Sequence, residues 1–147
     1  MMRTVLKVCA VVALGLTPAA CSAYQYITVT GGLEQPSVVM IKSGDSDRPV
    51  LACVDSLAVF EPGRGSGLTG AVWRVRSADD RCATLRSITY GQTPEGFVVD
   101  TPAQPLKADT TYEISGHGWT RGLMPHVPWI GGGRFSYTDG AWRSTSD

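Results

Sequence analysis

The side chains best suited to acid–base or metal chemistry in this chain are its two histidines, His117 and His126. A zinc or iron site would need them to converge with carboxylates or thiolates. No aspartate or glutamate lies between Glu113 and Asp139, so the sequence around the histidines offers no such ligands. We therefore expect no metal and no cofactor.

A nucleophilic site would combine a serine, a histidine and a carboxylate, which can come from distant parts of a sequence. The chain has no Gly-x-Ser-x-Gly motif, the turn that exposes the serine in many hydrolases. Adjacent carboxylates such as Asp79-Asp80 lie in turn-like sequence, where short polar side chains bond to nearby backbone. We expect a non-enzymatic protein without catalytic residues, and a secreted hydrolase that uses His117 or His126 is the alternative.

A segment rich in glycine, proline and tryptophan runs from residue 117 to residue 133. We interpret it as a long loop between two late strands, and long loops in compact domains tend to be functional. It also contains residue types that are enriched at protein–protein contacts. The predicted partner-binding residues are His117, Trp119, Arg121, Met124, His126 and Trp129. Alternatively, Trp119 and Trp129 fold back into the core.

Residues 65–70 (GSGLTG) match the glycine spacing of dinucleotide-binding loops. That motif binds a pyrophosphate only where a helix N-terminus follows it. Here residues 71–76 follow, and their alternation predicts a strand with Trp73 on its core side and with Arg74 and Arg76 facing outward. The glycine pattern therefore indicates a loop.

The first residues have the pattern of an export signal. Arg3 and Lys7 precede an apolar run at residues 8–16, which is shorter than the ~20 residues of a membrane span. We interpret residues 1–20 as a signal peptide. Without it the chain keeps 11 of its 13 basic residues against 13 acidic ones, and no basic block is present. Nucleic acid is therefore not an expected partner.

Residues 17–22 (TPAACS) are similar to a bacterial lipobox. The resemblance implies that Cys21 is lipidated and becomes the new N-terminus, and Ser22 after it points to the outer membrane. Acyl chains on Cys21 would then hold the domain at the membrane. The alternative is cleavage after Ser22 or Ala23, which would release a soluble periplasmic protein.

Two cysteines, Cys53 and Cys82, lie inside the predicted domain. An exported chain meets an oxidising compartment, so we expect these two residues to form a disulfide. No Cys-x-x-Cys pair is present to suggest a structural zinc site. Two buried free thiols are the alternative.

Short runs of β-branched and aromatic residues, separated by turn-forming residues, predict an all-β chain. The expected strands cover residues 24–30, 38–41, 50–60, 71–76, 84–90, 97–99, 112–115 and a closing hairpin at 135–142. Asp55-Ser56 interrupts the third of these, and Asp139-Gly140 forms the hairpin turn. Residues 21–30 are expected to be a lipidated N-terminus with a tether or first strand, and residues 31–147 one domain.

The pattern Leu106-x-Ala108-Asp109-Thr110-x-Tyr112 resembles a motif of fibronectin type III and immunoglobulin-like domains. The resemblance implies an immunoglobulin-like antiparallel β-sandwich of about 7–9 strands. It also implies a tyrosine corner, in which the Tyr112 ring packs in the core and its hydroxyl bonds to backbone a few residues upstream.

A broader set of positions looks like those of small uncharacterised Gram-negative lipoproteins, some of which are proposed immunity or accessory proteins of the periplasm. These positions are Trp73, Tyr90-Gly91, Pro94, Gly96, Leu106, Tyr112, Phe135, Asp139-Gly140 and Trp142. The likeness implies a periplasm-facing lipoprotein of the outer membrane with an immunity or accessory role. From the composition of the 117–133 loop, we expect it to bind a periplasmic or envelope protein through that loop. A structural envelope component without a binding pocket is the alternative.

Overall fold

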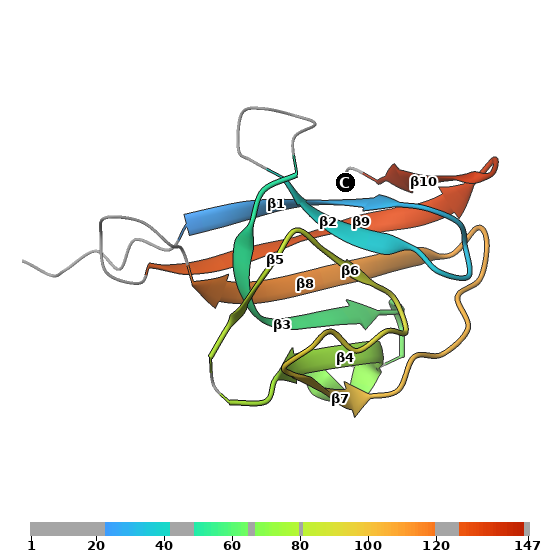
Figure 1. Ribbon diagram of the computed structural model, residues 1–147. Helices are drawn as coiled ribbons and strands as arrows, with labels where there is room; N and C mark the ends of the chain where they lie inside the picture. The colour runs from blue at the N-terminus through green and yellow to red at the C-terminus, as the bar shows by residue number, and fades with distance from the viewer. Residues whose placement is uncertain (1–22, 42–48, 65–66, 80, 120–126, 146–147) are drawn as a thin grey trace, which may run out of the picture.

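The computed structural model describes residues 23–41, 49–64, 67–79, 81–119 and 127–145. Ten strands and one turn of 3₁₀-helix form most of these residues (Figure 1). The elements are β1 (Ala23–Thr30), β2 (Ser37–Ile41), β3 (Ala52–Phe60), η1 (Gly67–Gly70), β4 (Ala71–Ser77), β5 (Ala83–Leu85), β6 (Ser87–Thr89), β7 (Phe97–Thr101), β8 (Thr111–Trp119), β9 (Pro128–Thr138) and β10 (Ala141–Ser144). No α-helix occurs in the described ranges, so the prediction of an all-β chain is confirmed.

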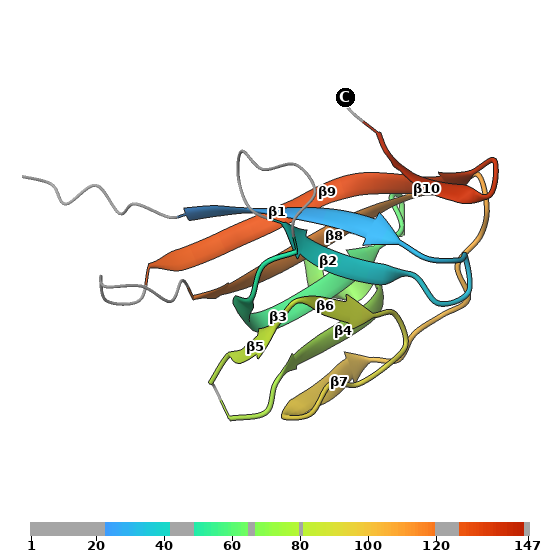
Figure 2. The same ribbon diagram turned by 45° about the horizontal axis from the view of Figure 1, so that its top comes forward.

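The strands form one curled mixed sheet, whose main path has the order β6-β2-β1-β9-β8-β3-β4-β7 (Figure 2). Beside this path, β10 pairs with β9 and β5 pairs with β3. Among the described strands only β1 and β9 run parallel to each other. β1 is shared between two neighbours, because residues 23–25 pair with β9 and residues 26–30 pair with β2.

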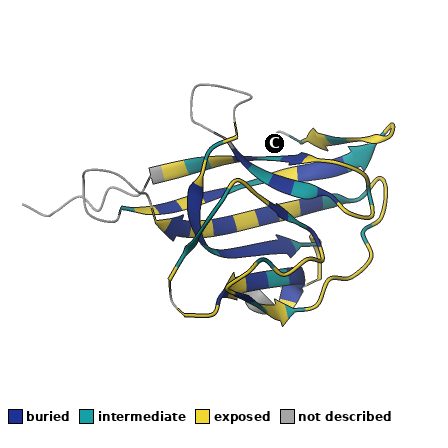
Figure 3. Ribbon diagram, viewed as in Figure 1, coloured by how far each residue is buried: buried dark blue, intermediate teal, exposed yellow. Residues whose placement is uncertain are grey.

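The curl brings the two ends of the sheet path together around the core. The ring of Trp73 on β4 lies 5.0 Å from the ring of Tyr90, which follows β6. The Tyr90 hydroxyl donates a hydrogen bond to Gln104 O at 2.6 Å, and burial raises the pKa of Tyr90 to about 12. Figure 3 shows the buried residues along the strands that enclose this core. Trp73 is buried and Arg74 and Arg76 are not, as the sequence predicts.

The predicted loop at 117–133 is shorter than expected, and most of it is strand. β8 continues to Trp119 and β9 begins at Pro128. The two strands pair from Thr111 with Ser136 to Trp119 with Pro128. On β8, residues 112, 114, 116 and 118 are buried and the odd-numbered residues between them are not. Gly116 and Gly118 therefore occupy core positions, where the ring of Trp129 lies next to them.

The segment 84–90 contains two short strands where the sequence predicts one. β5 pairs with β3 and β6 pairs with β2, so the chain changes its partner strand at Arg86. Arg86 is exposed, whereas Ile88 and Tyr90 are buried on the side that faces the core. The break between β5 and β6 explains why Arg86 is exposed although Ile88 and Tyr90, two and four residues later, are buried.

The predicted tyrosine corner is confirmed. Tyr112 is 2% exposed, and its hydroxyl oxygen accepts a hydrogen bond of 2.9 Å from the backbone N–H of Lys107. Asp109 lies between these two residues with a φ of 56°. Aspartate tolerates this left-handed conformation better than most residues.

Replacing Tyr112 by phenylalanine tests the tyrosine corner. The change removes the acceptor of the Lys107 N–H, and we expect the free energy of unfolding to fall by about 1 kcal/mol. Urea denaturation measures the loss, with Tyr26→Phe as a control at a tyrosine that is 45% exposed. Equal stability of the Tyr112→Phe variant and the unmodified protein would contradict the assignment.

Candidate functional site

One row of residues crosses four neighbouring strands on the solvent side of the sheet. Ser56 on β3 pairs with His117 on β8, His117 pairs with Ile130 on β9, and Ile130 pairs with Tyr24 on β1. Directly paired residues on neighbouring strands project to the same face. We call the side of β1, β9, β8 and β3 that carries this row the outer face.

Large apolar side chains are exposed on the outer face. Tyr24 is 58% exposed, Ile130 57% and Trp119 39%. Trp119 follows His117 by two residues on β8, so it lies on the same face and diagonal to Ile130. The Tyr24 ring also lies 5.0 Å from the ring of Tyr26, which is 45% exposed. Adjacent exposed apolar side chains of this kind mark interaction sites more often than scattered ones do.

A groove of about 420 Å³ lies beside the exposed apolar residues. Residues 131–133, three consecutive glycines of β9, contribute to its lining, so no side chain of theirs fills it. Tyr24 and Ile130 line it as well, together with Glu113 and Arg134, whose Oε2 and Nε lie 3.8 Å apart. The groove therefore joins apolar surface to an exposed ion pair.

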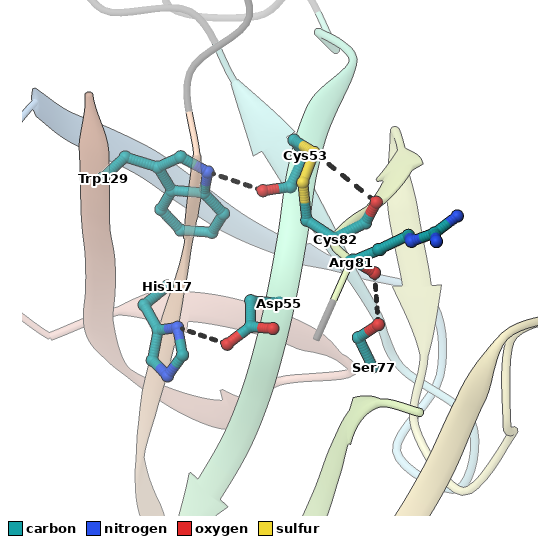
Figure 4. The surroundings of a disulfide bond; sticks show 7 residues. All are labelled: Cys53, Asp55, Ser77, Arg81, Cys82, His117 and Trp129. Atoms are coloured by element: carbon teal, nitrogen blue, oxygen red, sulfur yellow. Dashed lines mark hydrogen bonds and ion pairs between the residues drawn. A yellow bond between two sulfur atoms is a disulfide. The ribbon is translucent and has the colours of Figure 1, made fainter. Parts of the chain in front are cut away.

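A polar cluster occupies the other end of the row. The His117 ring lies with Nε2 2.9 Å from Ser56 Oγ and with Nδ1 3.2 Å from Asp55 Oδ2. Its side chain is 53% exposed and that of Asp55 30%, whereas Ser56 is 7% exposed. The cluster therefore places a solvent-accessible imidazole between a carboxylate and a hydroxyl. Figure 4 shows the His117 ring beside Asp55.

The predicted disulfide between Cys53 and Cys82 is confirmed. It joins β3 to the segment that precedes β5, and Cys53 pairs with Trp119 on β8. The carbonyl of Cys53 accepts a hydrogen bond of 2.9 Å from the indole N–H of Trp129 (Figure 4). The disulfide thus braces the part of β3 that lies next to both tryptophans.

The predicted partner-binding residues divide into three groups. His117 and Trp119 are exposed on the outer face. Trp129 is 1% exposed, so its assignment as a contact residue was wrong and it belongs to the core, where Gly116 and Gly118 make space for its ring. Arg121, Met124 and His126 lie outside the described residues, as does Cys21.

Four residues of the outer face were not identified from the sequence. Tyr24 and Ile130 stood in segments interpreted as a strand or tether and as a loop. For Tyr24, the small and polar neighbours Ala23 and Gln25 were a signal of a two-faced strand. Asp55 and Ser56 were interpreted only as an interruption. Their approach to His117 depends on the pairing of β3 with β8, which the local sequence does not encode.

Within the described ranges, no group of three or more His, Cys, Asp or Glu side chains is arranged to hold a metal ion. The same part of the chain contains no helix long and apolar enough to cross a membrane. Comparisons with family models, with curated proteins and with solved structures gave no match.

Proposed function

We propose that this chain is a membrane-anchored protein-binding module, an immunoglobulin-like sandwich that is lipidated at Cys21 and that contacts an envelope protein through its outer face. The exposed apolar residues of that face carry the proposal. Tyr24, Ile130 and Trp119 come from three neighbouring strands and lie in contiguous positions. Aromatic and aliphatic anchors of this kind supply most of the affinity at protein interfaces.

The strand arrangement supports the immunoglobulin-like assignment. β9, β8, β3 and β4 follow one another as strands G, F, C and C′ do in a variable-type domain. β1, β2 and β6 are neighbours in the rest of the path, and the shared strand β1 connects the two groups. The hydrogen bond between Lys107 N–H and the Tyr112 hydroxyl adds the corner that is typical of such domains.

The proposed anchor fixes which end of the domain lies near the membrane. Only Ser22 separates Cys21 from the start of β1 at Ala23, so acyl chains on Cys21 would hold that end of the strand close to the lipid headgroups. Ala23 pairs with Trp129 on β9, and the preceding residue of β9, Pro128, pairs with Trp119. The partner is therefore expected to lie in or on the same membrane, within reach of Trp119.

Capture from a detergent extract of the cell envelope tests the proposal. The full chain is compared with the double variant Trp119→Ser/Ile130→Ser and with Val99→Ser, a control at a residue of β7 that is 42% exposed and lies at the far edge of the sheet. Loss of two interface anchors costs at least ~1 kcal/mol each, so we expect the double variant to bind the captured protein at least about tenfold more weakly.

Thermal unfolding of each variant should show that the fold is retained, because all three substituted residues are exposed. If Val99→Ser reduced binding as much as the double variant does, the outer face would not be the specific binding site. If no protein is captured whose binding depends on Trp119 and Ile130, the alternative of a structural envelope component is favoured.

A further inference from the structure

The irregularity in β3 places two consecutive polar residues on the same face of the sheet. In a regular strand, Asp55 and Ser56 would point to opposite faces. The register between β3 and β8 shifts between Val54 and Ser56, which makes Asp55 the extra residue of a β-bulge. As a result both side chains reach the same residue of β8, His117.

The hydrogen bonds determine where the protons of this cluster lie. His117 Nδ1 lies 3.2 Å from Asp55 Oδ2, and an ionised carboxylate can only accept a hydrogen bond. In the neutral imidazole the proton therefore sits on Nδ1, and Nε2 carries a lone pair. At 2.9 Å, Nε2 then accepts the hydrogen bond that the Ser56 hydroxyl donates. This order of carboxylate, imidazole and hydroxyl is the one that activates a serine as a nucleophile.

The groove on the outer face is lined by residues that neighbour His117. Ser115 precedes His117 by two residues on the same face, and Ile130 is the partner of His117 on β9. Both residues line the groove over residues 131–133. The groove is thus lined by two neighbours of His117 on the outer face, and a substrate bound in it would lie next to the cluster.

A cation lies on the opposite side of the serine. Arg76 on β4 is the partner of Ser56, so that both side chains project to the same face. The Arg76 side chain is 47% exposed, and its Nε lies 2.9 Å from Asp100 Oδ1. A positive charge at this position can stabilise negative charge that develops on a carbonyl oxygen bound to Ser56.

We propose that Ser56 is an acyl-accepting nucleophile toward carboxylic esters, with His117 as the general base and Asp55 as a positioning residue. His117 Nε2 takes the hydroxyl proton while Ser56 Oγ bonds to the ester carbonyl carbon. The ester C–O bond then breaks, and the leaving alcohol receives the proton from His117. Water attacks the acyl group in the same manner and releases a carboxylic acid and the free serine. This activity goes beyond partner binding and departs from the expectation of a non-enzymatic protein.

Labelling with a fluorophosphonate probe tests this proposal directly. Attack by Ser56 forms an Oγ–P bond and breaks the P–F bond, so that fluoride leaves and the serine stays modified. We expect mass spectrometry to find one adduct, on the peptide that contains Ser56, and Ser56→Ala to abolish it. His117→Gln keeps a polar side chain but removes the base, and should slow labelling at least about 100-fold. Asp55→Asn should slow it at least about tenfold.

The control is Ser87→Ala, which removes an exposed serine of β6 and should label at the unmodified rate. Hydrolysis of p-nitrophenyl acetate should follow the same order among the variants. A folded protein without an adduct at Ser56, or an adduct that forms equally fast in His117→Gln, would overturn the proposal.

Discussion

Replacing Gly118 by alanine is expected to destabilise the protein by about 3 kcal/mol or more. A Cβ atom at this position would lie 1.9 Å from the carbonyl oxygen of Cys53 and 2.8 Å from Trp129 Nε1. The Cys53 oxygen belongs to the neighbouring strand and cannot move without disturbing the ladder between β3 and β8. The same methyl group would also separate the indole N–H from the carbonyl that accepts its hydrogen bond.

Reversible denaturation in urea measures this effect, and Gly32→Ala is the matched control. A Cβ atom at Gly32 would meet no atom within 4 Å, so that variant should keep its stability within about 0.5 kcal/mol. Unchanged stability of Gly118→Ala would show that Trp129 does not pack against β8 as described. The companion variant Trp129→Ala should lose about 3–5 kcal/mol, because it leaves a large cavity in the core.

Removal of the disulfide has the second large effect that we expect. Cys53 and Cys82 are 29 residues apart, and in the chain-entropy model a cross-link of that span stabilises a fold by ~3–4 kcal/mol. The double variant Cys53→Ala/Cys82→Ala should therefore unfold at a clearly lower urea concentration, with its spectrum of native secondary structure retained in the absence of denaturant.

Each single cysteine variant should lose about as much stability as the double variant, because either substitution removes the same cross-link. Urea denaturation of all three proteins makes the comparison. If the single variants and the unmodified protein unfolded at the same urea concentration, the cross-link would have no role in stability. The disulfide would then not stabilise the part of β3 beside the two tryptophans.

Local sequence patterns were sufficient for many of the strands. The alternation around Trp73 and the β-branched runs at 38–41 and 97–99 are found as β4, β2 and β7. The Asp139-Gly140 turn has positive φ at both residues, 53° and 76°, as expected for the hairpin that joins β9 and β10. In these segments the propensities of neighbouring residues and the tertiary structure favour the same conformation.

The hairpin of β8 and β9 could not be predicted in the same way, because glycine usually indicates a loop. Here Gly131 and Gly132 lie where neighbouring strands approach so closely that a larger residue would clash. A Cβ atom at Gly131 would lie 2.2 Å from Gln25 O on β1, and one at Gly132 would lie 2.4 Å from Ile114 O on β8. The alternation along residues 111–119 carried a usable signal, since Gly116 and Gly118 continue the series of core positions.

The cluster of Asp55, Ser56 and His117 depends on features that appear only in the folded chain. Ser56 and His117 are 61 residues apart in sequence and become neighbours through the pairing of β3 with β8. A bulge is also needed to bring Asp55 to the same face, and the sequence gives only an interruption at that position. The hydrolase alternative therefore named His117 from the sequence but not its partners.

Site-specific photocross-linking tests whether the outer face binds a partner at the membrane. A photoreactive amino acid at position 130 should form one distinct adduct with an envelope protein in intact cells. The same amino acid at position 99 should not form it, because β7 lies at the other edge of the sheet. An adduct specific to position 130 is the predicted result, whereas no adduct there, or the same adduct from both positions, would contradict binding through the outer face.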